Sequence, residues 1–355
     1  MNDLSERIGD KKVYLYGAGN LGKRLSHFLK HQGIKIECFL DREKSSSLIE
    51  GLKVENPFTG KIDHKNALVI ASIFNRDISF LDIKNKLLAI GFDNIISFVE
   101  FHPYCSHEFG NWYWLSNDKD YLFDERKIEV VYNSLSDTLS REIFSAIIRT
   151  RKTDIYEYLP IPYPIEEQYF SEDVPLNKFK DFIDCGAYDG DTLDVLINRK
   201  IPINKYYAFE PDLHNFKKMT NKARKYGSQT ILFPCGVHSN TEFFRFNSGA
   251  GEGSMISDEG NEVIQCVALD DVLVNVISEP VLLKMDIEGA ELDALKGAER
   301  LIKTCDIDLA ICLYHKPQDI LEIPQLISSF GNYKFYVRLY GHYGMELVLY
   351  AIKQK

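Results

Sequence analysis

Acidic and basic side chains follow four strand-like segments in the second half of the sequence. Asp184, Glu210, Asp286 and His315 each lie at or just beyond the end of such a segment. Ligands of open α/β sheets bind at the carboxyl edge of the strands, so we expect these side chains to meet there. Carboxylates accept hydrogen bonds or bind a positively charged group, and the unperturbed pKa of histidine lies near neutral pH. The pattern predicts ligand binding combined with proton transfer.

The turn CGAYDGDTL follows the first of these segments. Gly186 and Gly190 permit a close backbone approach to a ligand, and the start of the following helix directs N–H groups to the same place. The turn also contains Asp184, Asp189 and Asp191. Three carboxylates would repel a pyrophosphate, which favours a ligand with an ammonium or sulfonium group. S-adenosylmethionine has this chemistry and NAD does not.

The segment KYYAFEPD carries a second ligand-binding candidate. Glu210 lies near its end, 20 residues after Gly190. An acid at the end of a second strand accepts hydrogen bonds from the hydroxyls of a nucleoside ribose. Together with the glycine turn, Glu210 therefore predicts a nucleoside-containing cofactor.

Alternating strands and helices must position these residues. Because βαβ patterns build parallel sheets, we expect an α/β fold with an N-terminal Rossmann-like domain over 1–100, a helical, aromatic-rich connector over 101–175 and a second α/β domain over 176–355. In the first domain, strands are expected at 12–17, 34–41, 67–74 and 94–98, and helices at 20–32 and 78–92.

A second glycine turn, YGAGNLG, lies near the start of the chain. Gly17, Gly19 and Gly22 form a G-x-G-x-x-G pattern between a predicted strand and helix, and Asp41 ends the next predicted strand. No adjacent residues suggest hydride transfer. Three interpretations stay open: a nucleotide or nucleotide-sugar binding module, a fold retained for structure or dimer contacts, and an NAD site.

Composition restricts the class of partner. The chain has 355 residues, a formal net charge of −10 and 45% hydrophobic residues. The charge argues against nucleic acid, and no apolar run is long enough to cross a membrane. The polar N-terminus and seven cysteines without C-x-x-C spacing favour a cytoplasmic protein with buried thiols. We expect a small-molecule or glycan substrate and leave a homo-oligomer open.

The ordered motifs FIDCGAYDGDTL, YYAFEPD, CGVHS, GSMIS, VALDDVL, LLKMDIEGAELDALKGAERLI and YHKPQD resemble the FkbM family of S-adenosylmethionine-dependent methyltransferases over roughly residues 166–352. The resemblance implies a class I methyltransferase domain, in which the last of seven strands runs antiparallel. It also implies O-methylation of a hydroxyl on a sugar or natural product. For this chain we expect a surface glycan, nucleotide-sugar or glycosylated metabolite.

The resemblance also assigns residues to the cofactor. It places Glu291 beside the transferred methyl group and Ser254 in an inserted loop over the site. Asp286 and Glu288 would share the position beside the methyl group. The complete set of cofactor residues is Asp184, Gly186, Ala187, Gly190, Glu210, Cys235, Gly236, Val237, Asp286 and Glu288.

Methylation of a hydroxyl requires a group that removes its proton. His315 is the candidate general base, and Asp286 either orients His315 or binds the substrate hydroxyl. A divalent metal such as Mg or Mn, held by Asp286, Glu288 and His315, is a second hypothesis. Two other functions stay open: a non-catalytic nucleotide-binding protein, and an NAD-dependent oxidoreductase that works through the N-terminal domain.

Overall fold

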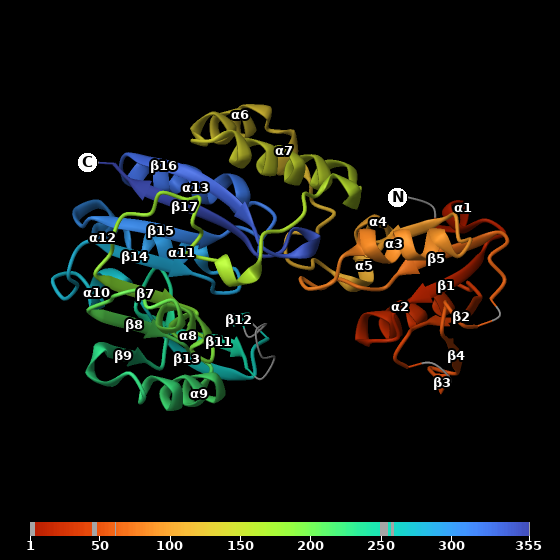
Figure 1. Ribbon diagram of the computed structural model, residues 1–355, viewed down its shortest axis with the longest axis horizontal. Helices are drawn as coiled ribbons and strands as arrows, with labels where there is room; N and C mark the ends of the chain where they lie inside the picture. Colours follow the sequence, from red (N-terminus) through yellow and green to blue (C-terminus); the bar gives the residue numbers. More distant parts are fainter. Residues whose placement is uncertain (1–3, 45–47, 61, 249–254, 257–258, 355) are drawn as a thin grey trace. The chain divides into compact units, whose positions relative to one another are not determined.

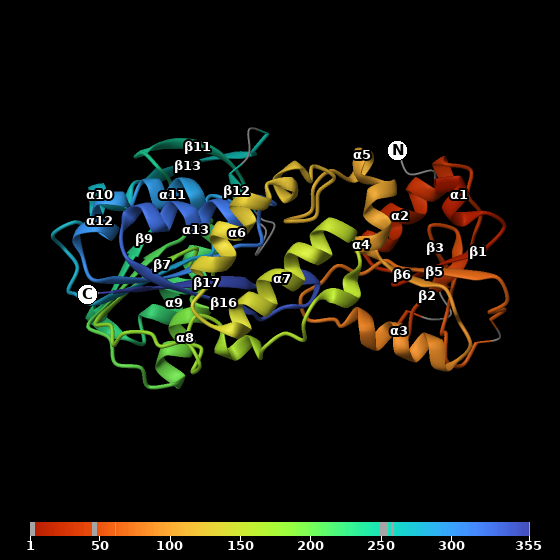
Figure 2. The ribbon, with the colours of Figure 1, turned by 90° about the horizontal axis from the view of Figure 1, so that it is seen from above.

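The apolar runs of the first hundred residues form a mostly parallel sheet. The computed structural model describes residues 4–44, 48–60, 62–248, 255–256 and 259–354. The first elements are α1 (Leu4–Ile8), β1 (Lys12–Tyr16), α2 (Asn20–His31), β2 (Ile36–Leu40), β3 (Leu48–Ile49), β4 (Leu52–Glu55), β5 (Ala67–Ala71), α3 (Phe80–Ala89), β6 (Ile95–Ser97), α4 (Phe98–Phe101) and α5 (Ser106–Phe109). The strand order is β3-β4-β2-β1-β5-β6, and β3 pairs antiparallel with β4. Helices α2 and α3 cover opposite faces of this sheet (Figure 2).

The predicted connector, residues 101–175, is divided between two compact units instead of forming one of its own. Helices α6 (Glu125–Ser134) and α7 (Thr138–Thr153) lie in this segment (Figure 1). The first unit comprises Met1–Asp124, Ile143–Pro162 and Gly341–Met345, and the second comprises Glu125–Glu142, Tyr163–Tyr340 and Glu346–Lys355. The boundaries differ from prediction because chain order does not reveal which distant segments pack together.

Aromatic side chains from distant parts of the sequence pack together within the first unit. The ring of Phe74 contacts the rings of Phe98, Trp112 and Tyr343. The indole N–H of Trp114 donates a hydrogen bond of 2.7 Å to the carbonyl of Tyr343. The segment Gly341–Met345 is therefore part of the core of a unit that otherwise ends at residue 162.

The second unit contains a seven-stranded sheet. Its elements are β7 (Asp181–Cys185), α8 (Asp191–Asn198), β8 (Lys205–Phe209), α9 (Leu213–Ala223), β9 (Thr230–Phe233), β14 (Val281–Met285), α11 (Glu291–Lys296), α12 (Glu299–Thr304), β15 (Ile307–Cys312), α13 (Asp319–Phe330), β16 (Tyr333–Leu339) and β17 (Leu347–Lys353). The order is β16-β17-β15-β14-β7-β8-β9, and β17 runs antiparallel to both its neighbours. Helices α11, α12 and α13 lie over one face, with α8 and α9 over the other (Figure 2). Every residue of β7, β14 and β15 is buried, as expected for strands covered on both faces.

A smaller four-stranded sheet interrupts the second series of strands and helices. It contains β10 (Gly236–Val237), β11 (Glu242–Asn247), β12 (Met255–Ile256) and β13 (Glu262–Val267), and α10 (Leu269–Val272) follows it. The order is β10-β13-β11-β12. Phe246, Ile264 and Cys266 form the apolar cluster on one side of this sheet. Ser254, predicted to lie in a loop over the site, falls outside the described residues.

Short 3₁₀ turns complete the secondary structure of the described residues. They are η1 (His102–Tyr104), η2 (Asp120–Phe123), η3 (Tyr156–Tyr158), η4 (Ile165–Glu167), η5 (Gly227–Gln229) and η7 (His342–Gly344).

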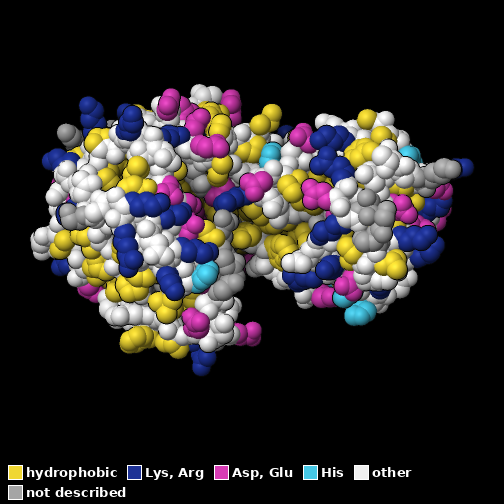
Figure 3. All heavy atoms as spheres, turned by 60° about the horizontal axis from the view of Figure 1, so that its bottom comes forward, with side chains coloured by type: hydrophobic (Ala, Val, Ile, Leu, Met, Phe, Trp, Pro, Cys, Tyr) yellow, Lys and Arg dark blue, Asp and Glu magenta, His cyan; other side chains and the backbone are white. Residues whose placement is uncertain are grey.

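The helices and the surface charges can be compared with the expectation that the chain binds neither membrane nor nucleic acid. Within the described ranges, no helix combines the length and apolar character needed to span a bilayer. On the face in Figure 3, Lys and Arg side chains are interspersed with Asp and Glu side chains. The absence of a nucleic-acid partner, the cytoplasmic location and a homo-oligomer stay predictions.

Candidate active site

The carboxyl ends of β7 and β14 meet at Gly186 and Asp286. These strands pair in parallel, with Cys185 opposite Met285, and the amide of Asp286 donates to the carbonyl of Cys185 at 3.0 Å. Gly186 has φ +80°, and a Cβ added there would lie 1.8 Å from the carbonyl oxygen of Asp286. We predicted that Gly186 allows close approach to a ligand, but its nearest neighbour is the backbone of the adjacent strand end.

Asp184 forms a buried ion pair under this junction. Its Oδ1 lies 2.8 Å from Nζ of Lys284, and the two side chains are 0% and 3% exposed. The hydroxyl of Tyr206 also donates to Asp184, while Lys284 donates to the carbonyl of Gly186 at 2.6 Å. Burial raises the pKa of Asp184, although Lys284 opposes this shift. Asp184 therefore contacts groups that hold the glycine turn in place.

Other carboxylates of the turn are also paired. Nζ of Lys222 lies 2.9 Å from Asp189 and 3.0 Å from Asp194. Asp191 begins α8, and its Oδ1 accepts a hydrogen bond from the amide of Thr192 at 2.7 Å. The turn is consequently less negative than a count of its acids indicates. Repulsion of a pyrophosphate is a weaker argument than the sequence suggested.

Glu210 joins the glycine turn to the end of β8. One carboxylate oxygen accepts from the amide of Tyr188 at 2.9 Å, and the other accepts from the amide of Asp212 at 2.8 Å. Burial raises the pKa of Glu210 to about 7. Because a carboxylate oxygen has two lone pairs, each oxygen retains one acceptor position. That geometry suits two hydroxyls of one ribose.

The predicted adenine-bordering residues follow β9. Cys235 and Val237 are buried, and Gly236 lies next to Cys266 and Pro211. A Cβ added at Gly236 would lie 2.7 Å from Sγ of Cys266 and 3.8 Å from Cγ of Pro211. This segment therefore lies beside the residue that follows Glu210. Ala187 is also buried, and its amide donates to the carbonyl of Phe209 at 3.1 Å.

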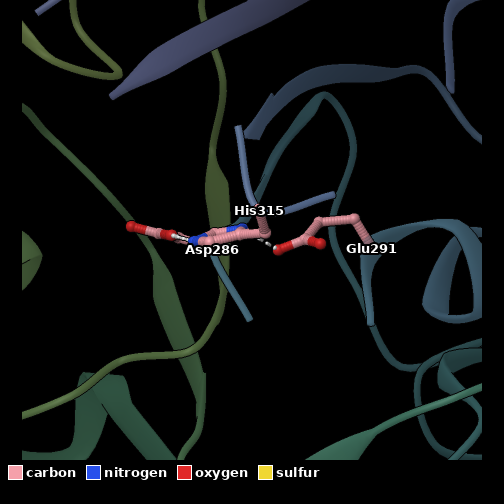
Figure 4. A group of neighbouring side chains, drawn as sticks. All are labelled: Asp286, Glu291 and His315. Carbon is pink, nitrogen blue, oxygen red and sulfur yellow. Dashed lines mark ion pairs between the residues drawn. The ribbon is translucent and has the colours of Figure 1, made fainter. Parts of the chain in front are cut away.

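His315 lies between carboxylates on both sides of its ring. Nδ1 is 2.8 Å from Oε1 of Glu291, while Nε2 is 3.3 Å from Oδ1 of Asp286 and 3.7 Å from Oε2 of Glu288. Figure 4 shows the imidazole between Asp286 and Glu291. We predicted that Asp286 either orients His315 or binds the substrate hydroxyl. Asp286 lies on the Nε2 side of the ring, and Glu291 lies on the Nδ1 side. The arrangement resembles a base whose second nitrogen is bound to an acid.

The carboxylates change the proton affinity of this cluster. Burial opposes the charged form of His315, but Glu291, Glu288 and Asp286 outweigh it and raise the pKa of His315 well above its usual value. The pKa of His315 therefore lies above the unperturbed value of histidine, for which His315 was chosen as the candidate base. Burial raises the pKa of Glu288 to about 8. For Asp286, Lys284 and His315 outweigh burial and lower the pKa.

Four residues that the sequence did not single out complete the cluster. The hydroxyl of Tyr169 donates to Oδ2 of Asp286 at 2.7 Å, and that of Tyr314 lies 3.4 Å from Oδ1 of Asp286 and 3.2 Å from Glu346. Gln168 donates to Glu346 at 2.7 Å. Tyr314 precedes His315, which was a usable signal, whereas Gln168, Tyr169 and Glu346 are distant in sequence.

A known protein family matches the part of the chain that contains this cluster. Residues 184–335 match the Methyltransferase FkbM domain. The match begins at Asp184 and includes Glu210, Asp286 and His315. It supports methyl transfer as the chemistry of this domain.

Two known proteins also resemble the chain, one over part of its length and one over nearly all of it. The hexuronic acid methyltransferase AglP of Haloferax volcanii is 25% identical over 127 residues, which cover 35% of this chain and 52% of AglP. The chain thus spans about half the length of this curated relative. The structure of methyltransferase FkbM from Methylobacillus flagellatus KT has a TM-score of 0.78 and 22% identity, covering 98% of this chain and 92% of that one. This likeness confirms the mixed α/β fold.

The predicted metal ligands lie within the FkbM-matched residues. Asp286, Glu291 and His315 offer potential ligand atoms within 4.8 Å of one another. Asp286 and Glu291 face different ring nitrogens, so an ion bound to one nitrogen does not lie between all three (Figure 4). In the predicted set, Asp286 and Glu288 both face Nε2 of His315, and this metal site stays a prediction.

The N-terminal glycine turn lies outside the FkbM-matched residues. Gly17 has φ +104°, and a Cβ added to Gly22 would lie 2.1 Å from the carbonyl oxygen of Gly17. Gly19 precedes α2 as its N-cap. The glycines therefore allow close packing of the turn against the first turn of α2.

Asp41 is already bound to this turn. Its carboxylate accepts from the amide of Ala18 at 3.0 Å, of Glu43 at 2.9 Å and of Lys44 at 3.1 Å. Burial opposes ionisation, but these N–H groups lower the pKa of Asp41. Arg24, in the first turns of α2, stacks on Phe109 with 4.5 Å between its Cζ and the ring centroid.

Proposed function

We propose that the chain is an S-adenosylmethionine-dependent O-methyltransferase that acts on a sugar hydroxyl. The placement of His315 between Glu291 and Asp286, at the sheet edge beside the Gly186 turn, carries this proposal. The match to the Methyltransferase FkbM domain supports the methyl-transfer part. AglP is a hexuronic acid methyltransferase, and its similarity to this chain supports a carbohydrate as the methyl acceptor.

The donor site would use residues at the ends of β7, β8 and β9. Glu210 has two remaining acceptor positions for the ribose hydroxyls. Cys235, Gly236 and Val237 would border the adenine, and the Gly190 turn would receive the methionine end. The bound cofactor supplies an electrophilic methyl group on a sulfonium. Asp184 would act indirectly by fixing Lys284 and the Gly186 turn.

The acceptor side would use the His315 cluster. Nε2 of His315 would accept the proton of the acceptor hydroxyl as that oxygen takes the methyl group, and the bound donor would keep the electron pair of the C–S bond on its sulfur. Glu291 holds Nδ1 and stabilises the imidazolium that forms. Asp286 accepts a hydrogen bond from the same hydroxyl and orients it. A sulfonium beside His315 would also lower the pKa of the imidazole in the loaded enzyme.

A divalent ion is a second form of the same proposal. Asp286, Glu288 and Nε2 of His315 would hold Mg²⁺ or Mn²⁺, which would polarise the acceptor hydroxyl. The carboxylates around His315 favour its protonated form, and a proton on Nε2 competes with a metal ion for the same nitrogen. We therefore expect undiminished turnover in EDTA. A loss that Mn²⁺ restores would instead establish the metal-dependent form.

The decisive experiment separates donor binding from chemistry. We expect calorimetry to detect micromolar binding of S-adenosylmethionine to the wild type and to His315→Ala, but not to Glu210→Ala. With a panel of sugars, the wild type should form a methylated product, and His315→Ala should lose roughly a hundredfold in kcat. Unchanged turnover by His315→Ala would remove His315 as the base. Failure of the wild type to bind the donor would overturn the proposed function.

A further inference from the structure

We propose that the methylated hydroxyl belongs to a neutral, hydroxyl-rich part of the acceptor, such as an uncharged hexose, and that the site disfavours a carboxylate next to that hydroxyl. This inference rests on the proposed function and narrows its substrate class. The proposed neutral sugar differs from the hexuronic acid on which the similar protein AglP acts.

The groups that open toward solvent at the site are carboxyl groups. The side chains of Asp286 and Glu288 are 23% and 15% exposed, whereas those of His315 and Glu291 are 2% and 0% exposed. An acceptor that reaches Nε2 of His315 therefore passes Asp286 and Glu288 first. Both lie within 4.0 Å of that nitrogen.

The hydrogen-bond donors of the cluster are directed at its own acids. The hydroxyl of Tyr169 donates to Asp286, and that of Tyr314 lies within hydrogen-bond distance of Asp286 and Glu346. Gln168 donates to Glu346. A tyrosine hydroxyl has only one proton, which is already directed at an acid of the cluster. These tyrosines can therefore accept a hydrogen bond from a bound sugar but not donate one to it.

The buried positively charged side chains near the cluster also contact acids or carbonyl groups of the protein itself. Lys284 lies 2.8 Å from Asp184 and donates to the carbonyl of Gly186, and both ring nitrogens of His315 face carboxylates. Lys316 is exposed, so water screens its ammonium group. Apart from Glu288, whose pKa of about 8 leaves it protonated at neutral pH, the site therefore presents mainly hydrogen-bond acceptors.

An acceptor-rich site selects for ligands that donate. Each sugar hydroxyl provides a proton, whereas a ligand carboxylate provides only lone pairs and a negative charge. A carboxylate on the sugar would lie beside Asp286, whose lowered pKa keeps its carboxylate ionised, and the repulsion between the two negative charges disfavours its binding. Glu288, with a pKa of about 8, adds a second negative charge only above that pH. Vicinal hydroxyls would instead satisfy the lone pairs of these acids.

Matched sugar pairs test this inference with the full chain. Methyl glucoside is compared with methyl glucuronide, and methyl galactoside with methyl galacturonide, at saturating S-adenosylmethionine. Mass spectrometry of the methylated product gives kcat/KM. We expect the neutral member of at least one pair to be favoured by about tenfold or more, because a nearby like charge is costly in a partly desolvated site.

A matched pair of variants links the selectivity to the cluster. Glu346→Gln removes one acid of the cluster, and we expect it to reduce the preference for the neutral sugar severalfold. Glu322→Gln changes an exposed acid on α13, and we expect it to leave the preference unchanged. The wild-type ratio tests the inference even if Glu346→Gln does not fold.

The outcomes separate the inference from the proposed function. A wild-type preference for the uronic acids, with normal donor binding, would overturn the inference and leave the methyltransferase proposal standing. Donor binding without methylation of any sugar would overturn the sugar acceptor and the inference together. A chain that does not bind S-adenosylmethionine in calorimetry would fail at the proposed function itself.

Discussion

At the scale of single residues, His315 is a base whose proton is held tightly. Because neighbouring carboxylates raise its pKa, the neutral form that can accept a proton becomes abundant only above neutral pH in the ligand-free protein. The proposed reaction should therefore accelerate as pH rises through neutrality. The bound sulfonium would move this transition to lower pH.

Glu291→Gln tests the control of that proton. A glutamine oxygen can still accept a hydrogen bond from Nδ1, but the negative charge is lost, so the pKa of His315 should fall. We expect the acidic limb of the kcat profile to move to lower pH by about one unit or more, with kcat at its plateau reduced roughly tenfold. The measurement is turnover against pH, with Glu322→Gln as control. A profile that does not move would show that Glu291 has only a structural role.

Glu210 predicts a different dependence on pH. The raised pKa of about 7 means that its carboxylate, which accepts the ribose hydroxyls, is lost as pH falls through neutrality. Binding of S-adenosylmethionine should strengthen roughly tenfold between about pH 6 and about pH 8, because only the ionised form accepts both hydroxyls. Calorimetry at several pH values measures this, and Glu210→Gln should remove the dependence. An affinity that is constant across this range would contradict the assignment.

At the scale of elements, the junction of β7 and β14 depends on one missing side chain. Gly186 and Gly190 both have positive φ, but an added Cβ lies 1.8 Å from the backbone of Asp286 at Gly186 and 3.4 Å from Met219 at Gly190. Gly186→Ala should therefore destabilise the fold by about 2–4 kcal/mol, against about 1 kcal/mol for Gly190→Ala. Chemical denaturation measures both. Equal losses would mean that backbone strain alone, and not the contact with Asp286, determines the requirement for glycine.

The elements also show what sequence can and cannot predict. Strands followed by glycine turns indicated the α/β class, because their apolar runs and spacing are local properties. The strand ends carrying Asp286 and His315 were expected to meet, and they do. The pairing of Asp184 with Lys284 and of Glu291 with His315 was not predicted, because it depends on register between distant segments. The ion pairs of the glycine turn also escaped prediction, since a count of acids ignores Lys222.

At the scale of the whole molecule, the two glycine turns should differ in function. Three backbone amides already occupy the carboxylate of Asp41, whereas two occupy that of Glu210. A ribose that needs two acceptor positions therefore fits at Glu210 and not at Asp41. We expect calorimetry to show binding of S-adenosylmethionine but not of NAD. Micromolar binding of NAD that Asp41→Ala abolishes would reverse this expectation and favour the oxidoreductase interpretation.

The aromatic core of the first unit has a consequence for synthesis of the chain. Tyr343 accepts a hydrogen bond from Trp114 and contacts the ring of Phe74, so a late segment completes an early unit. Domains generally fold as they leave the ribosome, with the N-terminal one first. Here the first unit lacks part of its core until residue 345 has been translated. The N-terminal part must therefore wait, with Phe74 and Trp114 incompletely covered, until the entire methyltransferase-matched region, residues 184–335, has been translated.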